Sequence, residues 1–340
     1  MLSVHKLWII SFLSIVVVVI LYLKSELSRL EDAHRSLEYK LSQSHVESRL
    51  FLPKVEESDQ DDLVVIYNRV PKTGSTSFVG VAYDLCKKNN FKVLHINITA
   101  NMHVMSLSNQ YKFAQNITKW REVKPALYHG HLAFLNFERL ETSSKPIFIN
   151  LIRKPLDRLV SYYYFLRHGD NFRPYLVRKK HGDKMTFDEC VERSLPDCDP
   201  NNMWLQVPFF CGHSAQCWKP GSRWALEQAK QNLVNHYLVV GVTEDMLGFI
   251  SVLEATLPRM FRGATDHYLN SKKSHLRQTS SKIEPNQKTI DKIHQSNVWK
   301  MENELYEFAL EHFKFVKKKV VSNEPNSIKQ TYFYEKVRPK

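Results

Sequence analysis

The chain has 340 residues, of which 43% are hydrophobic and 12% aromatic, and this composition excludes a largely disordered protein. Its formal net charge is +13, from 48 Lys and Arg against 35 Asp and Glu. Such an excess favours a polyanionic partner, which is nucleic acid, acidic lipid or an acidic polysaccharide, with improved solubility as the alternative explanation.

The amino-terminal part of the chain is predicted to hold a membrane anchor. Residues 7–23 are uncharged and almost wholly apolar, and they follow a short tail at 1–6 that we expect to be cytoplasmic. A cleaved signal peptide is the alternative. It is disfavoured because Val16–Ile20 is bulky and β-branched and because no small-x-small cleavage pattern follows Leu23.

Residues 24–62 are predicted to form a stem and linker on the lumenal side. Four leucines fit heptad positions and favour a coiled coil that assists oligomerisation: Leu27, Leu30, Leu37 and Leu41. A solvated helical spacer is the alternative. The acidic stretch 53–62 lacks apolar periodicity and is predicted to be a linker, so the globular domain is expected to cover 63–340.

Short apolar runs alternate with helical patterns along this domain. The predicted strands are Leu63–Tyr67, Lys92–Ile96, Pro146–Ile152 and Tyr237–Val242. The predicted helices are Phe78–Cys86, Pro155–Tyr164, 225–235, 244–257 and 286–314. This alternation predicts an α/β fold with a mostly parallel sheet flanked by helices on both faces.

A candidate phosphate-binding loop, residues 71–76 (PKTGST), lies between the first strand and the first helix. Small residues at a helix N-terminus point several backbone N–H groups at one place, where the helix dipole adds positive charge. Lys72 adds a full charge, and Thr73, Ser75 and Thr76 add hydroxyls. Since the lysine precedes the glycine, the loop differs from the GxxxxGK[ST] loop of nucleoside triphosphatases. A chance turn is the alternative.

Sequons and cysteines favour a lumenal location for the domain. Asn97 and Asn116 each begin an N-glycosylation sequon. Four of the five cysteines are clustered, namely Cys190, Cys198, Cys211 and Cys217. In a lumenal protein this predicts two short-range disulfides, most simply Cys190–Cys198 and Cys211–Cys217, with Cys86 as a free thiol. A zinc site is the alternative, although no CxxC spacing is present.

Two more segments carry candidate site residues. Arg153 directly follows a predicted strand, and Ser161 lies on the next helix; ligands of open α/β sheets bind at the carboxyl ends of strands. An arginine there binds phosphate well, with a surface salt bridge as the alternative. His129 and His131 would share one face of an extended segment and line one cleft as candidate bases. Packing histidines, or ligands of a stray metal, are the alternatives.

Together these segments resemble the sulfotransferases that use PAPS (3′-phosphoadenosine 5′-phosphosulfate). Residues 71–76 are similar to their 5′-phosphosulfate loop, and 151–165 (LIRKPLDRLVSYYYF) to their 3′-phosphate segment. Four further segments extend the likeness over essentially the whole chain: YHGH at 128–131, FDEC at 187–190, KKSHLR at 272–277 and YFYEK at 332–336. Within this family the chain resembles the heparan sulfate 2-O-sulfotransferases of the Golgi.

The resemblance implies a set of donor-binding residues. The 5′-phosphosulfate would be held by Lys72, Thr73, Gly74, Ser75 and Thr76. The 3′-phosphate would be held by Arg153 and Ser161, with Ser274 and Arg277 closing over the nucleotide. His131 would be the base, assisted by His129, while Lys72 balances charge on the bridging oxygen, and no metal is required.

The resemblance also implies the acceptor and the assembly. The target would be the 2-hydroxyl of a uronic acid, chiefly iduronate, in heparan sulfate. Because this acceptor is acidic, basic side chains are expected to line its cleft, with an ordinary solvated surface as the alternative; the candidates are Arg69, His95, Arg178, Lys179, Lys180, Lys272 and Lys273, with Tyr83 stacking against a sugar ring. The enzyme would be a type II protein of the Golgi membrane with two disulfides. It would form a homotrimer that brings Glu335 and Lys336 near a neighbouring subunit's substrate.

Three other functions remain as alternatives. A related enzyme acting on dermatan or chondroitin uronic acid, or on another glycan, is hard to separate by sequence. A lumenal sugar kinase would need magnesium-binding carboxylates near the loop, and no such set is evident. A non-catalytic heparan-binding membrane protein would need the basic surface but neither residues 71–76 nor the histidine pair. Nucleic acid is not expected as a partner.

Overall fold

The computed structural model describes residues 17, 19–24, 61–97, 103–142, 144–271, 279 and 281–321. The chain divides into two compact units, Met1–Val55 and Glu56–Lys340. In the first unit, residues 17 and 19–24 are helical. Among the described residues, no helix combines the length and apolar character that a membrane span requires. The predicted anchor and stem lie largely outside the described residues.

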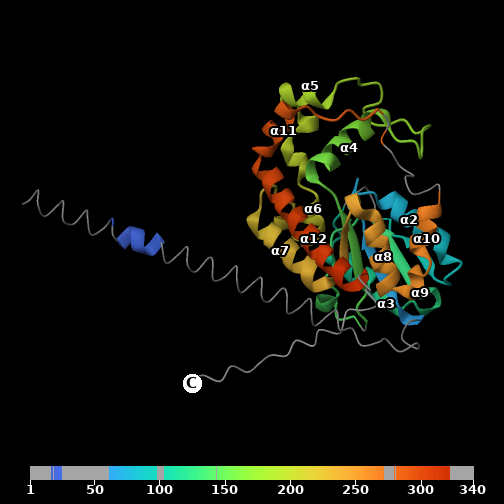
Figure 1. Cartoon of the computed structure of the whole chain (residues 1–340). Helices are drawn as coiled ribbons and strands as arrows, with labels where there is room; N and C mark the ends of the chain where they lie inside the picture. Colours follow the sequence, from blue (N-terminus) through green and yellow to red (C-terminus); the bar gives the residue numbers. More distant parts are fainter. Residues whose placement is uncertain are drawn as a thin grey trace, which may run out of the picture. The chain divides into compact units, whose positions relative to one another are not determined.

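A sheet of five parallel strands is the centre of the second unit (Figure 1), in the order β2-β3-β1-β4-β5. Its strands are β1 (Val64–Asn68), β2 (Lys92–His95), β3 (Ala126–Gly130), β4 (Ile147–Ile152) and β5 (Tyr237–Val242). Central strands β1 and β4 are buried on both faces and are mostly apolar, with Asn68 and Asn150 as their buried polar residues. The predicted parallel α/β fold is confirmed.

The strand order places a switch point between β1 and β4. The chain leaves β1 towards β3 and β2 on one side, and it leaves β4 towards β5 on the other. Connections that diverge in this way leave a crevice at the carboxyl ends of the two strands, where ligands of doubly wound sheets bind. Residues 71–76 follow β1, and Arg153 follows β4, so both candidate phosphate-binding segments lie at this crevice.

Helices flank the sheet in two groups (Figure 1). The first group packs around β1, β2 and β5 and comprises α2 (Ser75–Cys86), α8 (Met246–Thr256), α9 (Pro258–Phe261) and α10 (Ala264–Asn270). The second group comprises α4 (Pro155–His168), α6 (Gln206–Cys211), α7 (Arg223–His236) and α12 (Asn297–Val321). Three more helices are α3 (Leu107–Lys119), α5 (Phe187–Glu192) and α11 (Gln287–His294).

Short 3₁₀ helices complete the connections. They are η3 (Arg121–Val123), η4 (Phe137–Leu140), η5 (Pro196–Cys198), η6 (Pro200–Met203), η7 (Ala215–Trp218) and η8 (Thr243–Asp245).

Several predicted helix boundaries are wrong, each for a local reason. The predicted helix 286–314 is two helices: the Ser296 hydroxyl accepts a hydrogen bond from the Trp299 N–H and starts α12 as a separate helix. The predicted helix 244–257 begins as η8, and Asp245 caps α8 by accepting from the Gly248 N–H. α4 continues past Tyr164 to His168, where Gly169 ends it with a φ of 71°.

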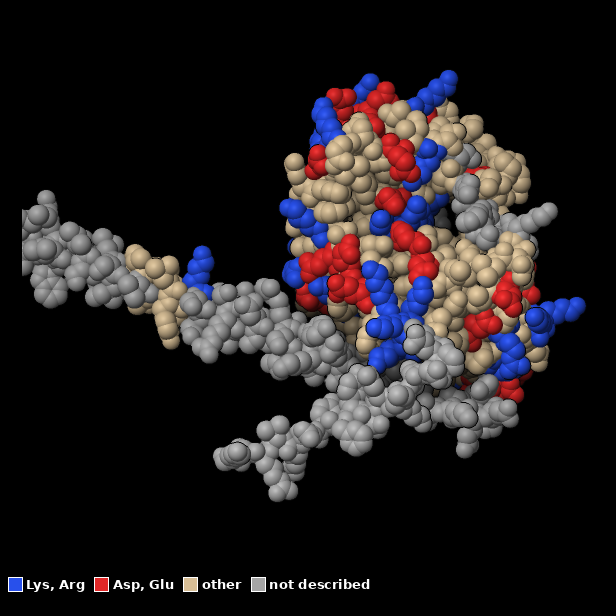
Figure 2. Space-filling view, viewed as in Figure 1, with Lys and Arg blue, Asp and Glu red and all other residues tan. Residues whose placement is uncertain are grey.

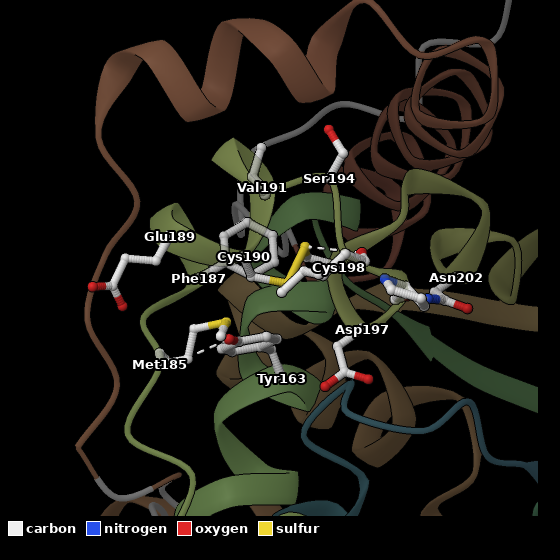
Figure 3. Close-up of a disulfide and its surroundings, with 12 residues drawn as sticks. Tyr163, Met185, Phe187, Glu189, Cys190, Val191, Ser194, Asp197, Cys198 and Asn202 are labelled. Atoms are coloured by element: carbon white, nitrogen blue, oxygen red, sulfur yellow. Dashed lines mark hydrogen bonds between the residues drawn. A yellow bond between two sulfur atoms is a disulfide. The ribbon is translucent and has the colours of Figure 1, made fainter.

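Both predicted disulfides are present, Cys190–Cys198 and Cys211–Cys217, and Cys86 belongs to neither. The first joins α5 to η5 beside the rings of Phe187 and Tyr163 (Figure 3). On the face of the molecule in Figure 2, basic and acidic side chains lie interspersed. The net positive charge is therefore not gathered into one unbroken basic surface on that face.

Candidate active site

A cavity of about 330 Å³ lies at the carboxyl ends of β1 and β4. Its lining brings together the predicted loop, Arg153, Ser161 and His131, which come from four separate segments. Three positive side chains line it, those of Arg69, Lys72 and Arg153, and no Asp or Glu is among the described lining residues. A pocket with this charge fits a ligand that carries several negative charges.

The loop at 71–76 has the backbone geometry of an anion site. Gly74 has a φ of 74°, and no side chain caps the N-terminus of α2 that follows it. Lys72 also has a positive φ, of 70°, which is unusual for a residue with a side chain. The fully buried Thr73 hydroxyl donates to the Val70 carbonyl at 2.9 Å, and Thr243 donates to the Thr73 carbonyl at 2.9 Å. The fold thus holds the loop open at a helix N-terminus.

The two predicted halves of the donor site contact each other through Lys72. The Arg153 guanidinium donates to the Lys72 carbonyl at 3.3 Å. The Lys72 ammonium donates to the Thr279 hydroxyl at 3.2 Å and lies 4.2 Å from the centre of the Phe165 ring. The hydroxyls of Thr279 and Ser161 are 3.3 Å apart. The residues expected at the two ends of the donor therefore line one continuous pocket.

His131 is held as a neutral imidazole with a defined tautomer. Its Nδ1 lies 2.8 Å from the Arg69 carbonyl oxygen. Because a carbonyl oxygen only accepts, Nδ1 carries the hydrogen, and the lone pair is on Nε2. Burial, followed by the nearby Arg69 charge, lowers the pKa of His131 to about 3. The ring that lines the pocket is therefore unprotonated near neutral pH, with its lone pair on Nε2.

His129 has the opposite arrangement. Its Nδ1 lies 3.2 Å from the Arg69 guanidinium, which only donates, so the Nδ1 lone pair is occupied. Nε2 therefore carries the hydrogen and donates to the Tyr83 hydroxyl at 3.1 Å. The side chain is 3% exposed, and burial with the Arg69 charge lowers its pKa to about 3. Of the two histidines, His131 lines the cavity described above, and His129 is not among its lining residues.

Predicted acceptor residues gather around His129. The His95 ring is 5.0 Å from the His129 ring, and Arg69 and Tyr83 bond to it directly. Arg178 lies elsewhere, with its guanidinium 4.3 Å from the centre of the Phe165 ring and 3.4 Å from the Asp170 carboxylate. Lys180 is paired with Asp197 at 3.2 Å, which gives it a structural partner.

Other predicted residues fall outside the described part of the chain or away from the pocket. Lys272, Lys273, Ser274, Arg277, Glu335 and Lys336 lie outside the described residues. Asn97 and Asn116 are both exposed, and Asn116 lies on α3. Lys179 is exposed as well.

Sequence reasoning missed several residues of the pocket. They are Tyr162, Phe165, Thr243, Met246 and Tyr268, together with Thr279, which bonds to Lys72. A signal existed for Thr243, because it directly follows a predicted parallel strand. A signal existed for Tyr162 and Phe165 as well, because they follow Ser161 on the same helix by one and four residues. Thr279 and Tyr268 have no such local signal.

Among the described residues, no group of three or more His, Cys, Asp or Glu side chains is arranged to hold a metal ion. The arrangement supplies loop amides at a helix N-terminus, two cations near them, and an imidazole with an available lone pair. It is suited to holding a polyanionic nucleotide and removing a proton from a second substrate.

Comparison with known proteins gives concordant results. The profile of a family described as "Sulfotransferase family" matches residues 58–309. Over 281 residues the chain is 64% identical to a Drosophila melanogaster protein named "Heparin sulfate O-sulfotransferase", covering 83% of this chain and 80% of that protein. It is 54% identical to the Gallus gallus protein and 52% identical to the Homo sapiens protein named "Heparan sulfate 2-O-sulfotransferase 1". Both alignments span 333 residues, 95% of this chain and 94% of the relative.

Proposed function

This chain belongs to the sulfotransferase family, and from that premise we propose that it transfers a sulfuryl group from PAPS to heparan sulfate. The acceptor atom in this proposal is the 2-hydroxyl of a uronic acid, chiefly iduronate. The observation that carries the proposal is the position of His131, which lines the same pocket as the loop at 71–76 and Arg153 and has its lone pair on Nε2.

The residues present fit a doubly phosphorylated nucleotide. The amides at the start of α2, with Lys72, Gly74, Ser75 and Thr76, would hold the 5′-phosphosulfate. The predicted Thr73 is 0% exposed and is not among the lining residues, and its hydroxyl donates to the Val70 carbonyl, so it would support the loop from beneath. Arg153 and Ser161 would hold the 3′-phosphate. Ser274 and Arg277, outside the described residues, complete the set by resemblance. The donor supplies an activated sulfuryl group, and no metal is needed to balance its charge.

His131 acts as the base in the proposed transfer. Its Nε2 takes the proton of the acceptor hydroxyl as that oxygen forms a bond to sulfur, while the bond from sulfur to the 5′-phosphate oxygen breaks. Lys72 balances the negative charge that remains on the leaving phosphate oxygen. His129 keeps Arg69 and Tyr83 in place, because it accepts from one and donates to the other.

Arg69, Tyr83, His95 and Arg178 are the proposed contacts to the acceptor. Cationic and aromatic side chains suit a carboxylated and sulfated sugar chain. We further propose that the protein is a type II glycoprotein of the Golgi membrane that acts as a homotrimer. Support for the membrane and lumenal location comes from the apolar run at 7–23, the exposed asparagines Asn97 and Asn116 and the two disulfides, whereas the homotrimer rests on the family resemblance.

Sulfate transfer to a panel of acceptors tests the proposal. Labelled PAPS would be supplied with N-sulfated heparosan, dermatan or chondroitin. We expect the wild type to label N-sulfated heparosan most strongly. His131→Ala should reduce turnover by about a thousandfold or more, since a base contributes about 10²–10⁴ and the cavity left by the ring also misplaces the acceptor. Binding of adenosine 3′,5′-bisphosphate to this variant should stay within about threefold.

Each other outcome has a distinct meaning. Preferential labelling of dermatan or chondroitin would show that the enzyme prefers that glycan to heparan sulfate. No labelling of any acceptor would favour the heparan-binding protein without catalysis. Near-normal turnover by His131→Ala would remove that residue from the role of base. The exposed His181 provides the control, and His181→Ala should keep full turnover.

A further inference from the structure

Arg153 has backbone groups that the sheet does not satisfy. The β1–β4 ladder ends at Ile149 and the β4–β5 ladder at Ile152, one residue before Arg153. The side chain of Gln206 supplies both missing partners. Its Oε1 accepts from the Arg153 N–H at 2.9 Å, and its Nε2 donates to the Arg153 carbonyl at 2.9 Å. One amide thus takes the place of the backbone of a neighbouring strand.

Gln206 is itself firmly held. It is 0% exposed and is the first residue of α6. The Glu302 carboxylate, also 0% exposed, accepts from the backbone N–H groups of Leu205, Gln206 and Val207 at 2.8, 3.3 and 3.1 Å. A buried carboxylate at the start of a helix satisfies amides that would otherwise be unpaired. The amide that holds Arg153 therefore has little freedom to move.

We propose that Gln206 is a positioning residue for donor binding, which fixes the backbone of Arg153 so that its guanidinium faces the 3′-phosphate. This inference rests on the proposed function, because it takes Arg153 as the group that binds that phosphate. Gln206 is not among the residues that line the pocket, so its effect on the nucleotide passes through Arg153. The Arg153 guanidinium also donates to the Lys72 carbonyl at 3.3 Å.

The chemistry of the contact requires an amide. A primary amide offers a donor and an acceptor side by side, whereas an ionised glutamate offers only acceptors and methionine offers neither. In Gln206→Glu one carboxylate oxygen would face the Arg153 carbonyl, and protonation of that carboxylate would restore the donor. The charged groups packed around this position are Arg153, Arg158 and Glu302.

The test measures nucleotide binding by calorimetry, with two ligands that differ only in the 3′-phosphate. Gln206→Met should weaken binding of adenosine 3′,5′-bisphosphate about tenfold, and binding of adenosine 5′-monophosphate less than about twofold. In a variant that already carries Arg153→Ala, adding Gln206→Met should weaken bisphosphate binding by less than about a further twofold. Gln228→Met on α7, which removes a hydrogen bond to Asn232, is the matched control and should alter neither affinity.

Gln206→Glu gives a second readout that a merely structural role would not produce. Its affinity for the bisphosphate should rise by about threefold or more relative to wild type as the pH is lowered from 7.5 to 5.5, because protonation restores the donor. This arm also decides the matter if Gln206→Met fails to fold.

The outcomes separate the inference from the proposed function. If Gln206→Met weakens the binding of both nucleotides equally, Gln206 does not act through Arg153. The same conclusion follows if Gln206→Met weakens bisphosphate binding as much in the Arg153→Ala background as it does in the wild type. The inference also fails if Arg153→Ala weakens bisphosphate binding while Gln206→Met does not. If Arg153→Ala leaves bisphosphate binding unchanged, the proposed donor site fails first.

Discussion

His129 and His131 lie two residues apart and have opposite tautomers because different atoms of Arg69 contact them. The guanidinium of Arg69 donates to His129 Nδ1, and its carbonyl accepts from His131 Nδ1. Only the second contact leaves the lone pair on Nε2, and only His131 lines the pocket. At this scale, one arginine decides which of two similar side chains is able to act as a base.

Gly74 is a residue-scale test of the loop. It has a φ of 74°, and a Cβ placed there would lie 2.9 Å from Met246 Cε and 3.2 Å from Thr243 Cγ2. Gly74→Ala should therefore shift the loop and weaken bisphosphate binding by about tenfold, while lowering stability by about 1–2 kcal/mol.

Gly182→Ala is the matched control for Gly74→Ala. Gly182 has a φ of 89°, and a Cβ there would meet nothing within 4 Å. Gly182→Ala should lower the free energy of unfolding by about 1 kcal/mol, because of backbone strain alone, and should leave nucleotide affinity unchanged. Calorimetry and thermal unfolding of both variants check this. Equal nucleotide affinities for the two variants would show that the geometry at Gly74 does not matter for binding.

At the scale of elements, the two disulfides differ in what they brace. Cys190–Cys198 joins α5 to η5 beside Tyr163. Cys211–Cys217 closes the turn between α6 and Trp218, whose indole stacks on His103. His103 Nδ1 donates to the His131 carbonyl at 3.2 Å. The second disulfide is therefore connected to the proposed base through two rings, and the first has no such connection among the described contacts.

Removing each disulfide in turn tests that difference. Each double Cys→Ser variant should lower the free energy of unfolding by roughly 2–3 kcal/mol, as expected for short closed loops. Only the loss of Cys211–Cys217 should also lower kcat, by about tenfold, at a temperature where both variants remain folded. Denaturant unfolding and steady-state kinetics measure the two effects. An equal loss of kcat in both variants would mean that the disulfides contribute only general stability.

At the scale of the whole molecule, one buried histidine and three half-buried histidines stay neutral in the fold. Burial lowers the pKa to about 3 for His129 and His131 and to about 4 for His213 and His312. The pKa of a histidine in an unfolded chain is about 6.5. At pH values between the folded and the unfolded pKa, the unfolded chain binds more protons than the folded chain. Acidification in this range therefore favours unfolding.

The fold should therefore lose stability as the pH falls from about 6.5 towards 4, and it should retain the full histidine contribution above 6.5. Each buried histidine contributes up to about 1 kcal/mol per pH unit in that range. His312→Leu should reduce the pH slope of the melting temperature, and His181→Leu, at an exposed site, should not. A melting temperature that is unchanged between pH 7 and 5 would contradict this.

Local patterns in the sequence were sufficient for four of the five described strands and for the two ends of the proposed donor site, whereas β3 was not predicted as a strand. Residues 71–76 and Arg153 were predictable because each follows an apolar run, and parallel strands bring their carboxyl ends to one edge. The disulfide pairs were predictable because their cysteines are six and eight residues apart. Short-range chemistry of this kind depends on spacing along the chain.

The tertiary structure alone decided the roles within the site. His131 differs from His129 through contacts with Arg69, about 60 residues earlier, and Gln206 reaches Arg153 across 53 residues. Thr279 reaches Lys72 across 207 residues. Hydrogen-bond partners so distant in sequence leave no periodic or local pattern. A tautomer or a buried amide pair is therefore determined only when packing has fixed which donor faces which acceptor.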